Sequence, residues 1–345
     1  MYAYWLLFLF FAAGALNESM RVAPSRRVPL LLVGMLLIAV VMGMRYEVGA
    51  DWIPYKMMFY NARFSDLERV LGRGDPGYQL LNWSVQQAGG QLWTVNLICA
   101  LIFVWGLRRF VVAQTRPWLA ALVAIPYLVI VVMCYTRQGV AIGILMAGMA
   151  SYFKRRSSLQ FAMWAIAAAL FHKTAVAVFP LVALTGHRGR LINVLIGLSG
   201  CALLYDVFLS NDIDLFVKNY INTAYASQGA AVRIAMSLLP AVLFLANERG
   251  FRFPDVERAV WRNFALATLL LTALLFLLPS TTAVDRLALY VIPLQLAVWS
   301  RFPGIFTASA FGSLLVVAYS AAVQFTWLNF AVHAQYWLPY RYYPL

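Results

Sequence analysis

The sequence is poor in charged residues, cysteine and histidine, and each shortage narrows the classes of protein to which it can belong. Only 12% of its 345 residues are charged, about half the fraction found in soluble domains. The three cysteines lie inside apolar segments without the spacing of a metal or disulfide site, so we interpret them as buried apolar side chains. No P-loop, dinucleotide fingerprint, Cys/His metal cluster or nucleophilic-serine elbow appears, and we expect neither a cofactor nor a metal.

Long apolar runs dominate what is present. Hydrophobic residues make up 63% of the chain, and the mean hydropathy is +0.75. Because stretches near the length of a membrane span recur throughout, we expect an all-α, polytopic transmembrane helical bundle, a single integral-membrane domain over residues 1–345. We expect about 12 spans. Their approximate limits are 2–16, 28–44, 92–112, 117–134, 137–153, 158–171, 174–185, 191–209, 232–246, 264–278, 287–299 and 305–323.

The distribution of basic residues predicts the orientation of these spans. Six alternate connections hold sixteen of the 27 Lys and Arg residues but only four of the 13 acids. Since cytoplasmic loops are enriched in Lys and Arg, we place these connections in the cytoplasm and both termini outside, in the periplasm. The same rule accounts for the net charge of +14, so we expect no nucleic-acid partner.

Two segments are then expected to form periplasmic loops, 45–91 and 210–231. The first is long enough to contain helices of its own, and loops of this length are usually functional. Within it, Asp75 and Pro76 have the residue types of a helix N-cap followed by a first-turn proline. The apolar side chains that follow, beginning with Tyr78, predict short amphipathic helices on the outer membrane surface.

The pair His172-Lys173 interrupts a long apolar run on this outer side. An ionisable group at membrane depth costs about 2.5 kcal/mol or more, so the pair lies at a water boundary or has a function. His172 is either an interfacial, hydrogen-bonded histidine or a general base. A nearby cation would lower the pKa of the imidazole and keep it neutral, as a base must be. Lys173 could supply that charge or contact a phosphate itself.

Arg137 lies between two apolar spans that are joined with almost no loop. It is either an arginine that extends to the interface at a tight turn or an anion-binding residue, and we favour anion binding because the other arginines of this type lie on the cytoplasmic side. A guanidinium suits phosphate since its planar fork donates two parallel hydrogen bonds. The small residues Gly139, Gly143, Ala147 and Ser151 follow at four-residue spacing, which predicts close packing against a neighbouring helix.

Three further charged residues lie where predicted helices begin on the outer side of the membrane. Asp285-Arg286 is either a local ion pair that anchors a helix or part of a binding site, and Arg233 is either an interfacial anchor or a phosphate contact. Several cations on one side are more informative than any one of them. A compact dianion such as pyrophosphate would explain why this face carries them all.

The segment from Gly49 to Tyr55, with Arg45 and Glu47 just before it, combines acidic and aromatic residues beside the membrane. It is either a solvated interface loop or a sugar-binding surface, because aromatic faces and carboxylates suit sugars. Asp51 is the carboxylate of this segment.

The order of these motifs resembles the EpsG-like, Wzy-type family of exopolysaccharide and O-antigen polymerases. The similarity covers most of the chain. The residues that carry it are Gly49-Ala-Asp51-Trp-Ile-Pro-Tyr55, Asp75-Pro-Gly-Tyr78, Arg137-Gln-Gly-Val-Ala141, Phe171-His172-Lys-Thr-Ala175 and Arg286-Leu-Ala-Leu-Tyr290. Two positions depart from the family pattern, with Asp75 in place of Glu and Thr174 in place of Ser.

The resemblance implies a GT-C-like glycosyltransferase in the bacterial cytoplasmic (inner) membrane. Its partners would be glycans linked to polyprenyl (undecaprenyl) pyrophosphate, membrane lipid and a chain-length regulator protein. His172 is the expected base and Asp51 the reserve. The expected pyrophosphate contacts are Arg137, Lys173, Arg233 and Arg286. The other expected substrate contacts are Arg45, Glu47, Tyr55, Asp75, Tyr78, Gln138, Asp285 and Tyr290.

Three other functions remain open at this point. An O-antigen ligase would differ only in its acceptor. A flippase or transporter of lipid-linked oligosaccharide would need charges along a path to both sides, whereas the deep charges here gather at the outer side. A membrane acyltransferase would also use a histidine but would not need this set of arginines.

Overall fold

The computed structural model describes residues 1–20, 28–72, 74–185, 227, 229–278 and 281–343, with a few isolated residues between 195 and 202. Within these ranges the chain is helical and forms no β-strand beyond one bridge between Arg45 and Tyr342. The prediction of an all-α fold is thus confirmed. The expected span at 191–209 and most of the expected loop at 210–231 lie outside the described residues.

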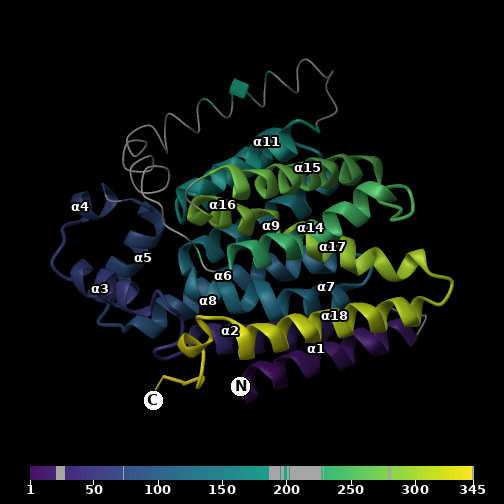
Figure 1. The fold of residues 1–345 in the computed structure, drawn as a ribbon. Coiled ribbons are helices and arrows are strands. Elements are labelled where there is room, and N and C mark those ends of the chain that lie inside the picture. Colours follow the sequence, from purple (N-terminus) through teal and green to yellow (C-terminus); the bar gives the residue numbers. More distant parts are fainter. Residues whose placement is uncertain are drawn as a thin grey trace.

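The first half of the chain forms packed helices, and α1 lies along one edge of the bundle (Figure 1). The helices outside the segment 45–91 are α1 (Tyr2–Met20), α2 (Val28–Gly43), α6 (Leu92–Val112), α7 (Pro117–Ala124), a π-helix (Ile125–Val129), α8 (Ile130–Cys134) and α9 (Thr136–Arg155). The segment Pro117–Cys134 is 94% buried. A helix that is apolar on all sides belongs in the interior, and this one lies at the centre of the bundle.

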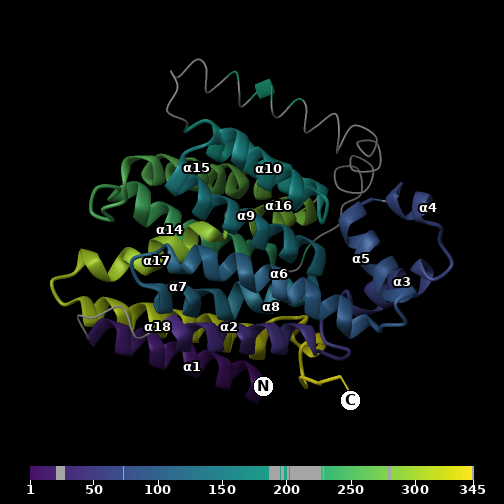
Figure 2. The ribbon, with the colours of Figure 1, turned by 180° about the vertical axis from the view of Figure 1, so that it is seen from behind.

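The second half of the chain packs around this centre (Figures 1 and 2). Its elements are α10 (Ser158–Ala169), a 3-10 helix (Lys173–Val178), α11 (Phe179–Ala183), α14 (Ala230–Ala246), α15 (Asp255–Leu277), α16 (Thr281–Ala288), 3-10 turns at Leu289–Val291 and Phe302–Ile305, α17 (Pro293–Arg301), α18 (Ser309–Phe330) and a last 3-10 turn (Ala334–Tyr336). Only 33% of α15 and of α18 is buried, so these two helices lie on the outside.

The lengths of the helices decide which can cross a membrane alone. Among the described residues, α6, α7–α8, α15 and α18 are long and apolar enough, and α16–α17 with their 3-10 turns add a fifth span if this pair, bent by 45°, counts as one. Several further apolar helices have 10–17 residues. The chain is therefore a multi-pass membrane protein, and the total of about 12 spans stays a prediction.

Close packing of α6 against α9 fixes the helix that begins beside Arg137. A Cβ atom on Gly143 would lie 2.6 Å from the Cα atom of Phe103. No side chain fits at that separation, so only glycine lets the two backbones approach. The close approach predicted for this small-residue face is confirmed at Gly143.

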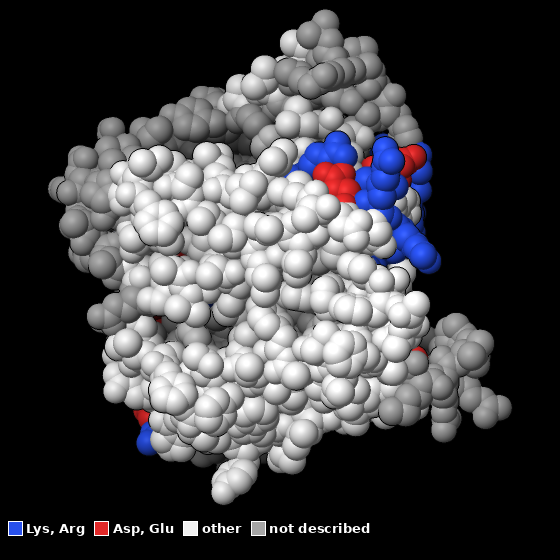
Figure 3. Space-filling view, turned by 45° about the vertical axis from the view of Figure 1, so that its right-hand side comes forward, with Lys and Arg blue, Asp and Glu red and all other residues white. Residues whose placement is uncertain are grey.

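The two ends of the bundle differ. The short helices of the segment 45–91 are α3 (Trp52–Ala62), α4 (Leu67–Leu71) and α5 (Pro76–Gln87). They form one end of the molecule, opposite the turn between α14 and α15 (Figure 1). That turn carries Glu248, which pairs with Arg262 of α15. In a view of one side, charged side chains gather at one edge beside a broad uncharged surface (Figure 3). Surfaces of this kind are rare on soluble monomers and suit a bilayer.

Candidate functional site

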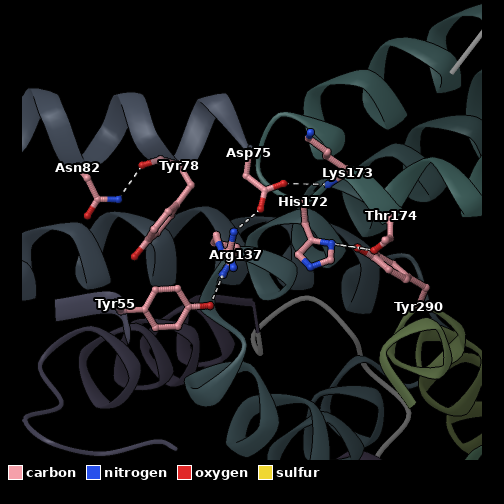
Figure 4. Close-up of polar contacts among 9 residues, drawn as sticks. All are labelled: Tyr55, Asp75, Tyr78, Asn82, Arg137, His172, Lys173, Thr174 and Tyr290. Carbon is pink, nitrogen blue, oxygen red and sulfur yellow. Dashed lines mark hydrogen bonds and ion pairs between the residues drawn. The ribbon is translucent and has the colours of Figure 1, made fainter. Parts of the chain in front are cut away.

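Three breaks in helical structure meet at the end of the bundle beside α5. Arg137 is the second residue of α9, Asp75 directly precedes α5, and His172 lies between α10 and the following 3-10 helix. Their side chains point toward one another, with Tyr55 and Tyr290 on either side (Figure 4). Residues up to 118 positions apart in sequence thus come into hydrogen-bonding distance.

Asp75 connects three of these elements. Its carboxylate accepts a hydrogen bond from Arg137 Nη1 at 2.5 Å and another from the backbone N–H of Lys173 at 3.1 Å. The backbone N–H of Gly77 also donates to the carbonyl of Leu170 at 2.8 Å, so the start of α5 is fixed over the end of α10. The predicted helix start at Pro76 is confirmed, but the predicted capping bond of Asp75 is not made.

The conformation of Asp75 suits this role. Its φ is +58°, a left-handed backbone that aspartate adopts more readily than most residues. Burial raises the pKa of the carboxyl group, and the charge of Arg137 opposes that rise. A charge-assisted hydrogen bond is about twice as strong as a neutral one, and it offsets part of the cost of burying both groups.

The ring of Tyr55 lies on the other side of the Arg137 guanidinium. The guanidinium carbon lies 5.9 Å from the ring centre of Tyr55, and the backbone N–H of Arg137 donates to the Tyr55 hydroxyl at 3.5 Å. Tyr55 in turn meets Tyr78 edge to face at 5.6 Å. The arginine is therefore placed by an acid on one side and a ring on the other, which leaves it in a fixed orientation.

His172 is oriented through one ring nitrogen. Its Nδ1 lies 2.7 Å from the Thr174 hydroxyl and 3.1 Å from the Tyr290 hydroxyl, and these hydroxyls are 3.2 Å apart. When Nδ1 carries the proton and donates it to Thr174, Nε2 is the basic nitrogen. Nε2 makes no hydrogen bond to any described residue. The ring can thus accept a proton from a bound molecule.

The environment of His172 keeps the imidazole neutral. Burial is the largest of the effects that lower its pKa to about 3, and the positive charges of Arg137 and Arg286 are the others. Lys173, the cation that the sequence suggested for this effect, lies with its ammonium group beside Gly74.

Arg286 and Asp51 extend the site toward α16 and α3. The Arg286 guanidinium lies over the ring of Tyr135, 5.4 Å from its centre. Its backbone carbonyl accepts a hydrogen bond from Gln138 Nε2 at 2.6 Å. Burial raises the pKa of Asp51, and Arg286 and Arg137 are the charges that oppose the rise. Tyr135, which no motif singled out, therefore serves as the platform for this arginine.

A tight backbone turn places Asp51 there. Gly49 has a φ of +105°, which L side chains rarely adopt, and its N–H donates to the carbonyl of Tyr336 at 2.8 Å. A Cβ atom on Gly49 would lie 3.0 Å from the carbonyl oxygen of Met133. Glycine thus lets this segment lie directly on the turn that precedes Arg137.

Arg233 and Asp285 form a buried ion pair beside the site. Arg233 donates to both carboxylate oxygens, from Nε at 2.7 Å and from Nη2 at 2.5 Å. Ser227 bonds both partners, at 2.9 Å to Arg233 and 2.8 Å to Asp285. One of the two interpretations of Asp285-Arg286 was a local ion pair, whereas Asp285 pairs with Arg233 and so joins α16 to α14. The roles predicted for Arg233 and Asp285 in substrate binding gain no support from this geometry.

Removing one partner of this pair should destabilise the fold. Asp285→Asn should lower the free energy of unfolding by about 3–5 kcal/mol, because it leaves a buried guanidinium without its counter-charge. Thermal unfolding of the purified protein in detergent measures the effect. Arg341→Gln, which breaks the exposed pair with Glu47, is the control and should change the melting temperature little. Equal melting temperatures for the two variants would contradict this assignment.

Two predicted contacts lie away from the cluster around Arg137, Asp75 and His172. Arg45 is 2% exposed and donates to the hydroxyl of Thr136 at 2.8 Å and to Asn96 at 3.3 Å. It therefore supports the first turn of α9 from inside the bundle. Glu47 lies at the surface, where Arg341 donates to it at 2.9 Å. The substrate contacts predicted for Arg45 and Glu47 stay predictions without geometric support.

The cluster thus contains most of the predicted site. Among the described residues no group of three or more His, Cys, Asp and Glu side chains could hold a metal ion together.

A cavity of about 150 Å³ adjoins the cluster and is lined by Asp51, Tyr135 and, from the other end of the chain, His333. No sequence pattern predicted His333 at this place, because its neighbours resemble an aromatic interfacial tail.

Comparison with known proteins identifies a family for this chain. The sequence model of the EpsG family matches residues 28–342. No curated protein matches the chain. No solved structure matches it either.

Proposed function

Because the chain belongs to the EpsG family, and is thus an exopolysaccharide or O-antigen polymerase in general terms, we propose that it joins oligosaccharide repeat units carried on polyprenyl pyrophosphate. The site would lie on the periplasmic side of the bacterial inner membrane, with α3–α5, the 210–231 segment and both termini on that side. The observation that carries the proposal is the placement of a neutral histidine beside Arg137, Asp75 and Lys173 at one end of the bundle.

The proposed reaction is a displacement at the anomeric carbon of the donor sugar. A hydroxyl of the acceptor sugar forms the new C–O bond, and the bond from the anomeric carbon to the pyrophosphate oxygen breaks. Nε2 of His172 takes the hydroxyl proton, while polyprenyl pyrophosphate leaves with the bonding electrons. A single displacement inverts the anomeric configuration. Asp51 is the alternative base.

The cations would supply the stabilisation that the leaving group needs. Pyrophosphate leaves readily once its growing charge is met by fixed donors, and such electrostatic stabilisation is usually the largest catalytic term. Arg137 is pre-oriented by Asp75 and Tyr55, and Arg286 by Tyr135. These arginines support a GT-C-like, metal-independent transferase. Tyr78, Gln138 and Tyr290 would line the sugar-binding part of the site.

Reconstitution tests this function against its alternatives. Purified protein in phospholipid vesicles is incubated with lipid-linked repeat units, with and without a lipid A-core acceptor and a chain-length regulator. A ladder of polymer on polyprenyl pyrophosphate is expected. Transfer only to the lipid A-core acceptor would identify a ligase, and movement of the intact substrate across the bilayer without a new bond would identify a flippase.

The pH dependence of the reaction follows from the position of the histidine. Since the base must be neutral, activity falls only as the pH drops through the pKa of His172, which burial, Arg137 and Arg286 lower. We expect kcat/KM to stay level on acidification through about pH 6.5, the ordinary pKa of histidine. Rates at limiting substrate measure it.

A variant that lacks the cation of Arg286 tests the cause of the lowered pKa. In Arg286→Gln the pKa of His172 should rise, so the loss of activity should begin at a higher pH than in the wild type. Arg341→Gln, whose charge is at the surface, should leave the profile unchanged. An acid limb near pH 6.5 in the wild type, unchanged in Arg286→Gln, would contradict the lowered pKa of His172.

A further inference from the structure

A second, larger cavity lies between α14 and α18. It has a volume of about 440 Å³, within the range of small-molecule sites. The residues that line it include Tyr127, Val232, Met236, Ala322, Val323 and Phe330. Arg233 is the only Lys, Arg, Asp or Glu among the described residues of this lining. We refer to this cavity as the apolar groove.

The groove opens at the outer surface of the bundle. Val232 of α14 is 60% exposed and Phe330 of α18 is 71% exposed, and both line the groove. The surface that α18 presents is apolar, with Phe311 and Leu314 exposed as well. A chain that moves within a bilayer could therefore enter from the side, without crossing water.

At its inner end the groove adjoins the candidate site. The groove and the 150 Å³ cavity share Arg233, Trp327 and His333 as lining residues. The smaller cavity continues to Asp51 and Tyr135, on whose ring Arg286 lies. An apolar space thus leads from the surface of the bundle to the cationic cluster.

The charges along this path suit a molecule that has a long apolar chain and an anionic head group. Arg233 is held by both oxygens of Asp285, so the pair adds no net charge where an apolar chain would pass. The cation of Arg286 comes only beyond it, next to Tyr135. Part of the groove wall, including Tyr127, comes from the π-helix Ile125–Val129. Segments of π-helix frequently occur at functional sites.

We propose that the apolar groove binds the isoprenoid chain of the polyprenyl-pyrophosphate donor, with the pyrophosphate at Arg286 and the sugar toward His172. The inference rests on the proposed function, because that function supplies the lipid carrier. The occupant is the donor because its pyrophosphate is the group that must reach the cations. Lateral entry between α14 and α18 would then let the spent carrier return to the bilayer after each transfer.

Photolabelling tests the groove directly. Full-length protein in phospholipid nanodiscs is exposed to polyprenyl pyrophosphate that carries a diazirine in its isoprenoid chain. Labelled positions should map to 232–236 and 322–333, and an excess of unmodified polyprenyl pyrophosphate should remove the label. Ala322→Trp fills the groove and should lower labelling about tenfold. Ala318→Trp, one turn earlier on the same helix, exposed and outside the lining, should leave it unchanged.

Turnover gives an independent measurement. Ala322→Trp should raise KM about tenfold for a long-chain donor and leave KM for a geranyl-linked donor unchanged. Diffuse labelling, equal labelling of both variants, or equal competition by phospholipid would overturn the proposal. Labelling needs no turnover, so the two proposals can fail separately. If the wild type is labelled in the groove but makes no polymer, the proposed function alone is refuted. If it makes polymer without being labelled there, the groove proposal alone is refuted.

Discussion

His172→Ala should lower kcat for polymerisation by about 10²–10⁴-fold, the usual contribution of a general base. Single repeat units should accumulate on the lipid carrier, because donor binding through the arginines remains. The loss of rate is expected from the orientation of the ring, because Thr174 and Tyr290 bind Nδ1 and leave Nε2 for the acceptor hydroxyl. The rate of polymer formation by the purified, reconstituted variant measures the effect.

Two comparisons distinguish a missing base from a damaged fold. Added imidazole should restore part of the activity of His172→Gly, and Thr174→Ser should retain most of the wild-type rate because it keeps the hydroxyl that orients the ring. Asp51→Asn provides the test of the alternative base. A larger loss in Asp51→Asn than in His172→Ala, without rescue of His172→Gly, would transfer the role to the carboxylate.

Arg137→Lys should lower kcat by about 10²–10³-fold, similar to the loss of one oxyanion-stabilising donor. Lysine keeps the charge but has no planar fork that can bond Asp75 and a phosphate together, and it stacks less well on Tyr55. Arg137→Ala should lose more, since the buried carboxylate of Asp75 then has no counter-charge. Steady-state rates with saturating donor measure the loss.

Arg109 offers a matched control for this substitution. It also lies over aromatic rings, those of Trp105 and Trp164, but it belongs to the last turn of α6, outside the candidate site. Arg109→Lys should leave kcat within about twofold of the wild type. Equal losses in the two variants would show a general sensitivity to arginine replacement and contradict a role at Arg137.

The sequence predicts helices well wherever an apolar run has clear limits. The expected span 92–112 coincides with α6, and the expected break between 134 and 137 is the turn that separates α8 from α9. Other features depend on the packing of helices against one another, which the apolar runs of the sequence do not reveal. The span expected at 117–134 contains a π-helix, and that expected at 287–299 is part of a bent pair.

The site shows a similar division. Charges on the outward side identified Arg137 and His172, because ionisable groups are costly near a membrane and therefore stand out in an apolar sequence. Pairing between distant residues could not be read in the same way. Nothing in the sequence connects Asp75 with Arg137, or Arg233 with Asp285, since each pair is formed by helices whose packing brings them together.

Arg45 illustrates why an outward charge need not be a ligand contact. From the sequence it lies beside Glu47 and Asp51 at the end of a span, as a substrate-binding arginine would. In the fold its guanidinium turns inward to Thr136 and Asn96. A charge at a span end can therefore hold a neighbouring helix, and only the packing shows which role it has.

The stereochemistry of one turnover is the most direct test of the central claim, that His172 and the arginines form a single-displacement transferase site. Purified protein in vesicles is given one lipid-linked donor and one acceptor of known anomeric configuration, and the product is examined by NMR and the lipid by mass spectrometry. We predict an inverted linkage and one polyprenyl pyrophosphate released for each bond, both lost in His172→Ala and in Arg137→Ala. A retained configuration, or a bond formed at the wild-type rate in both variants, would contradict the account.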